Sequence, residues 1–105
     1  MFFKEYFTFS QLQRKLKGLE PKKECAYIID GFAYTYDKDR DLFHKVDNEK
    51  MSIEQIYDLV KIGDKVNMPT IVCFTKRNRH HLVQKYLDYC NSKGDVIQEE
   101  LSLPN

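Results

Sequence analysis

The segment "CAYIIDGFAYTY", residues 25–36, carries the strongest structural signal in this chain of 105 residues. Its β-branched and aromatic side chains follow no helical period, and these residue types favour strands. Between the two apolar halves lie Asp30 and Gly31, a pair that tolerates the positive φ angles required at both central positions of a type I′ turn. We therefore predict a β-hairpin. Its expected cross-strand pairs are Ile29 with Phe32 and Tyr27 with Tyr34.

The segments on either side of the hairpin have patterns of their own. In "FTFSQLQRKLKGL", residues 7–19, apolar side chains recur at helical spacing, Thr8 or Ser10 can cap the start, and Gly18 suits a left-handed helix end. After the hairpin, a polar run leads into "LFHKV", residues 42–46, which has the composition of a third short strand.

The second half of the chain alternates between helix and strand patterns. In "MSIEQIYDLVKIGDKVN", residues 51–67, Ser52 and Gln55 have the spacing of a capping box at a helix start. The β-branched run "TIVCF", residues 70–74, is typical of a buried strand. The remaining expected elements are a helix from Asn78 as cap to Gly94 and a strand in "DVIQEELSL", residues 95–103.

Together these patterns predict one globular domain over residues 1–105, with the element order αβββαβαβ. Its class is α+β, or a small α/β fold, with a mixed sheet and helices packed on it. A strand-helix-strand crossover from Thr70 to Leu103 would make residues 70–74 and 96–101 parallel neighbours.

Composition limits the class of protein. The chain is 42% apolar and 31% charged, close to globular averages, and its three widely spaced cysteines lie in apolar segments. We expect buried thiols rather than disulfides, and hence a cytoplasmic protein. The N-terminal residues lack the apolar core of a signal peptide, and no apolar run is long enough to cross a membrane. We predict no cofactor and no metal site, because the histidines and cysteines lack ligand spacing.

A basic segment offers the first candidate site. Residues 69–93 carry five Lys and Arg side chains and one acid, although the whole chain has a net charge of only +1. Within them, a basic loop lies between the predicted strand and helix: Lys76, Arg77, Asn78, Arg79, His80 and His81. A helix start already favours anions and disfavours cations, so a bound phosphate would offset this repulsion. We expect a binding or regulatory module that contacts nucleic acid or another phosphate-bearing ligand here, although a solvated basic turn explains the same residues.

Asp30 raises a different hypothesis. In "YIIDGF" it ends an apolar strand, and this short stretch resembles the first metal-binding Asp of PIN and NYN-type nucleases. The resemblance implies a small metal-dependent nuclease or phosphatase, which needs further carboxylates to bind its cations. The turn interpretation explains Asp30 without any activity, and the sequence favours a protein that is not an enzyme.

The aromatic N-terminus suggests a third function. Phe2, Phe3 and Tyr6 belong to a cluster that one short helix cannot bury entirely. An exposed apolar patch would fit a protein partner or a homodimer. The corresponding alternative is a protein-protein interaction module, such as an inhibitor, an immunity protein or an accessory factor of a mobile element.

Overall fold

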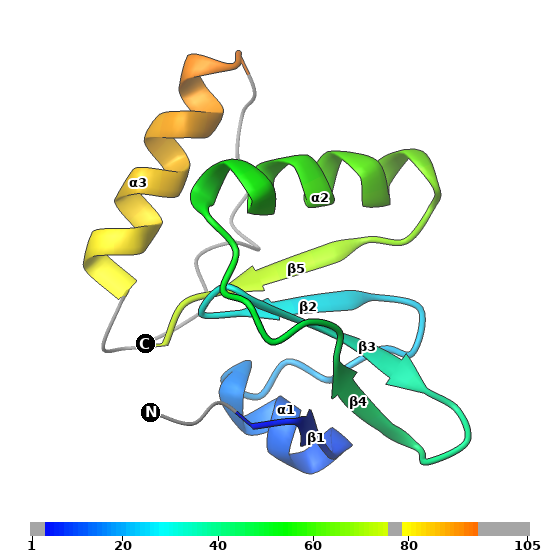
Figure 1. Cartoon of the computed structure of the whole chain (residues 1–105). Helices are drawn as coiled ribbons and strands as arrows, with labels where there is room; N and C mark the ends of the chain where they lie inside the picture. The colour runs from blue at the N-terminus through cyan, green and yellow to red at the C-terminus, as the bar shows by residue number, and fades with distance from the viewer. Residues whose placement is uncertain (1–3, 76–78, 95–105) are drawn as a thin grey trace.

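The computed structural model describes residues 4–75 and 79–94, which form a single α+β domain (Figure 1). In this part of the chain, five strands form one mixed sheet in the order β1-β4-β3-β2-β5. The strands β2 and β5 are parallel, and the other neighbouring pairs are antiparallel. The strands are β1 (Tyr6–Phe7), β2 (Ala26–Ile29), β3 (Phe32–Asp37), β4 (Leu42–Lys45) and β5 (Thr70–Cys73). The helices are α1 (Phe9–Lys15), α2 (Ile53–Lys65) and α3 (Arg79–Ser92).

The predicted hairpin is confirmed in both turn and register. Asp30 and Gly31 have φ angles of 51° and 93°, and β2 pairs with β3 through Ile29 with Phe32 and Tyr27 with Tyr34. The third strand follows as expected, because β4 pairs antiparallel with β3. The central strands are thus built from contiguous sequence.

Capping boxes start the first two helices. Ser52 accepts a hydrogen bond from the Gln55 backbone N–H at 3.2 Å, and the Ser52 N–H donates to the Gln55 side chain at 2.8 Å. Of the two caps considered for α1, Thr8 is the one used, and it makes the same reciprocal bonds with Gln11. These bonds satisfy backbone donors that a helix start leaves without a partner.

Helices cover both faces of the sheet (Figure 1), α1 on one face and α2 with α3 on the other. Alternate residues of β2 therefore enter separate cores, because successive strand side chains point to opposite faces. On the α1 side, Tyr27 packs with Leu12 and Phe43, whereas Ile28 on the opposite side packs with Ile56 and Tyr86. The three cysteines are buried, as predicted.

Two features differ from the predicted order. The short strand β1 was not anticipated, and it pairs with β4 through Tyr6 with His44 and Phe7 with Phe43. The helical spacing of apolar residues predicted for residues 7–19 ends early: α1 stops at Lys15, Lys17 has a positive φ, and Leu19 is 45% exposed. The predicted strand at 95–103 and the Asn78 cap lie outside the described residues. None of the three described helices has the length and apolar character required to cross a bilayer.

Candidate functional site

The parallel strands β2 and β5 bring two chain segments together at their carboxyl ends. Asp30 follows β2 directly, and its backbone N–H donates to the Cys73 carbonyl at 3.0 Å. Its side chain reaches beyond the strand end, where Oδ1 accepts the Thr75 backbone N–H at 2.8 Å. The hairpin turn is therefore fastened to the segment that leaves β5.

The predicted basic loop starts directly after Thr75, the residue that is hydrogen-bonded to Asp30. Thr75 immediately precedes Lys76, but Lys76, Arg77 and Asn78 lie outside the described residues. The helix α3 begins at Arg79, and His80 and His81 are exposed in its first turn. The first turn of α3 contains no acidic residue. The basic segment thus connects the carboxyl end of β5 to the start of α3, as expected from the sequence. The parallel neighbour of β5 among the described strands is β2, and the predicted neighbour at residues 96–101 lies outside the described residues.

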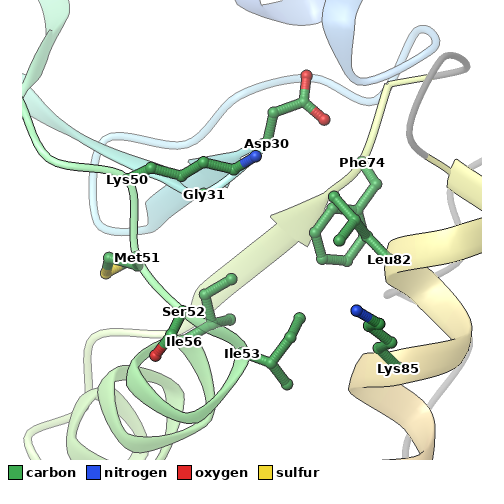
Figure 2. A pocket seen from close by; sticks show the side chains of 10 residues that line it. All are labelled: Asp30, Gly31, Lys50, Met51, Ser52, Ile53, Ile56, Phe74, Leu82 and Lys85. Carbon is green, nitrogen blue, oxygen red and sulfur yellow. The ribbon is translucent and has the colours of Figure 1, made fainter.

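A cavity of about 150 Å³ lies at the same edge, between α2, α3 and the ends of β2 and β5 (Figure 2). Its apolar lining comes from Met51, Ile53, Ile56, Phe74 and Leu82. Lys50, ahead of α2, and Lys85, on α3, reach it from opposite sides, and both are exposed. Ligands of α/β sheets commonly bind in this position, outside the carboxyl ends of parallel strands.

Gly31 explains how Lys50 reaches the cavity. A Cβ atom at Gly31 would lie 2.8 Å from Lys50 Cγ, so the absence of a side chain lets the lysine stem pass over the turn. The Met51 backbone N–H donates to the Gly31 carbonyl at 2.9 Å, which fixes the start of α2 against the hairpin. The same turn therefore positions Asp30, Lys50 and the helix start.

Asp30 is a buried acid that is hydrogen-bonded within the protein. The residue is only 7% exposed and is bonded to Thr75. Asp37 lies at the far end of β3 from the turn, roughly 17 Å along the strand from Phe32 at about 3.3 Å per residue. Within residues 4–75 and 79–94, no group of three or more His, Cys, Asp and Glu side chains is arranged to hold a metal ion. Among the described residues, Asp30 therefore does not belong to a carboxylate cluster of the kind that a two-metal site requires.

The N-terminal aromatic residues divide between surface and core. Tyr6 is 41% exposed on β1, with the Arg40 guanidinium 5.9 Å from its ring centroid. Phe7 is buried and packs against Tyr34, with ring centroids 4.8 Å apart. Phe2 and Phe3 lie outside the described residues. Of the predicted interface, only Tyr6 is therefore placed, at the edge of the sheet.

Lys50 and Lys85 are the site residues that the sequence did not single out. Lys85 follows His81 by four residues, so the predicted helix already placed both on one side. Lys50 carried no comparable signal, because its position depends on the docking of the α2 start against the hairpin turn.

Comparison with known proteins adds one distant relationship. The chain is 30% identical over 77 residues to adenylate kinase 7 of Macaca fascicularis. The match covers 73% of this chain and 14% of that protein, so the chain corresponds to a small part of the relative's length. No family model matches the chain, and no solved structure matches it.

Proposed function

We propose that this chain is a cytoplasmic binding module that holds nucleic-acid phosphates at the carboxyl edge of β2 and β5. In this proposal, residues 76–81 provide the phosphate contacts together with Lys50 and Lys85. The observation that carries the proposal is the convergence of two lysines from separate elements on the edge where the basic segment begins.

The local electrostatics support an anionic ligand. The starts of α2 and α3 lie near this edge, and each helix start carries a partial positive charge. Basic side chains beside such ends repel the helix dipole at a cost of about 0.3–1 kcal/mol each, which a bound phosphate would offset. One carboxylate oxygen of Asp30 already accepts a backbone N–H, so this acid is partly engaged within the protein.

Salt-dependent binding tests the proposal. A fluorescent oligonucleotide is titrated at several salt concentrations with the intact protein and with Lys50→Ala/Lys85→Ala. The slope of log affinity against log salt is expected to become shallower by roughly 1.5, because each phosphate that a lysine neutralises adds about 0.7–0.9 to it. Binding that ignores salt, or a double variant that binds like the unaltered protein, would overturn the proposal.

A matched control removes the same charge elsewhere. Lys15 and Lys65 are exposed residues in the last turns of α1 and α2, so Lys15→Ala/Lys65→Ala also removes two positive charges. Lys65 lies roughly 20 Å along α2 from the cavity end, at about 1.5 Å per residue. If this control flattens the salt slope equally, the binding depends on net charge and not on the edge.

A second candidate ligand is an adenine mononucleotide, which the name of the matched relative suggests. Its phosphate would use the same two lysines. Titration with AMP and ATP in place of the oligonucleotide distinguishes it, because a mononucleotide site binds them with saturation at one equivalent.

A further inference from the structure

The size of the cavity at Lys50 and Lys85 limits what it can enclose. Pockets for complete small-molecule ligands commonly measure about 300–1,000 Å³. This cavity measures about 150 Å³, which leaves room for one planar ring system but not for a whole nucleotide. The sugar and phosphate of a nucleotide seated here would remain outside.

The lining combines apolar residues and two lysines with one acid, Asp30, whose Oδ1 already accepts the Thr75 N–H. Ile53, Phe74 and Leu82 present apolar surface inside the cavity, and Lys50 and Lys85 stand at opposite sides of it (Figure 2). Unpaired bases bind apolar and aromatic side chains through their faces, while lysines hold the backbone. An apolar ligand without charge would make no use of the two lysines, and an inorganic anion would make no use of the apolar lining.

We propose that this cavity takes one unpaired base of a single-stranded nucleic acid, with the adjoining phosphates held by Lys50 and Lys85. The inference rests on the proposed function and narrows its ligand class. A base inside a duplex is stacked and paired, so it cannot enter the cavity without leaving the helix. The ligand class is therefore single-stranded RNA or DNA.

The test compares three probes of the same charge per strand. They are a labelled 12-nucleotide single strand, an abasic strand of the same length, and the blunt duplex of the first strand. The single strand is expected to bind at least about tenfold more tightly than the abasic strand and than the duplex. All three are measured by fluorescence anisotropy in the same buffer.

Filling the cavity provides the matched variants. Leu82→Trp places a large ring in the cavity and is expected to reduce the tenfold preference to about onefold while the salt slope remains. Leu87→Trp makes the same change on the same helix at a partly buried position that does not line the cavity, and it is expected to keep the preference. If Leu82→Trp fails to fold, methyl NMR of the unaltered protein provides a second readout. The methyl signals of Ile53 are expected to shift when the single strand is added and not when the abasic strand is added.

Each outcome separates the two proposals. Equal binding of the three probes with a steep salt slope overturns the base-binding inference and leaves the phosphate-binding function standing. A preference over the abasic strand that a folded Leu82→Trp leaves unchanged also overturns the inference. Absence of binding to every probe at low salt overturns both.

Discussion

Replacing Asp30 by alanine is expected to destabilise the domain by about 2–3 kcal/mol. The substitution removes the acceptor for the Thr75 N–H and leaves a partly buried donor without its partner, at roughly 1–2 kcal/mol. It also places alanine at a φ angle of 51°, which costs alanine about 1 kcal/mol more than aspartate. For a domain of this size, the sum corresponds to a fall in Tm of roughly 10–20 °C.

Asp30→Asn is the matched control. Its amide oxygen can still accept the Thr75 N–H, and asparagine tolerates positive φ, so the expected loss is below about 1 kcal/mol. Urea denaturation followed by circular dichroism gives both free energies of unfolding. Hydrogen exchange at the Thr75 amide is expected to accelerate in the alanine variant and to remain slow in the asparagine variant.

Two results would refute this reasoning. An alanine variant as stable as the unaltered protein would mean that the bond between β2 and the end of β5 contributes nothing. Equal losses in the two variants would mean that the negative charge matters and that the hydrogen bond and turn geometry do not. If Asp30→Asn keeps its stability but abolishes a metal-dependent hydrolysis, the nuclease hypothesis returns.

The other predictions concern the helix-to-strand connection and alkaline pH. Gly63→Ala would place a Cβ atom 2.5 Å from the Met68 carbonyl oxygen. We expect the free energy of unfolding measured in urea to fall by about 1–3 kcal/mol, although alanine has the better helix propensity. An unchanged free energy of unfolding would contradict the close packing. Burial raises the pKa of Tyr27 and of Tyr34 to about 12 from 10.0. The folded state thus keeps protons that the unfolded state releases above about pH 10. These two tyrosines therefore leave the free energy of unfolding unchanged below about pH 10 and lower it from there toward pH 12, by up to about 1.4 kcal/mol per pH unit for each tyrosine. Denaturation at stepped pH measures this fall; Tyr27→Phe is expected to reduce its slope, and constant stability up to pH 12 would contradict the assignment.

Local signals predicted the central part of the fold. The register of β2 and β3 followed from Asp30 and Gly31, because a two-residue turn leaves one pairing for the strands on either side. The start of α2 followed from Ser52 and Gln55 for the same reason, since a capping box is a contact within four residues. Both features depend on interactions that the neighbouring sequence contains.

Contacts between distant segments produce the features that were missed. The strand β1 has two residues and no period of its own, and it is held by remote partners: the Lys45 N–H donates to the Glu5 carbonyl at 2.7 Å, and the Tyr34 hydroxyl donates to the Lys4 carbonyl at 2.6 Å. The cavity likewise depends on the packing of α2 and α3 beside the hairpin turn. The basic segment and the Asp30-Gly31 turn were therefore visible in the sequence, whereas the cavity between them was not.

The parallel pairing of β2 with β5 has a consequence for the order of folding. The strands β2, β3 and β4 are joined by short turns, so their contacts close small loops at little entropic cost. The pairing of Ala26 with Thr70 closes a much longer loop, which contains α2. Contacts of such long sequence separation slow folding, so we expect β2, β3 and β4 to form the folding nucleus and β5 to join late. Weakening β5 then chiefly accelerates unfolding, whereas weakening the hairpin slows folding itself.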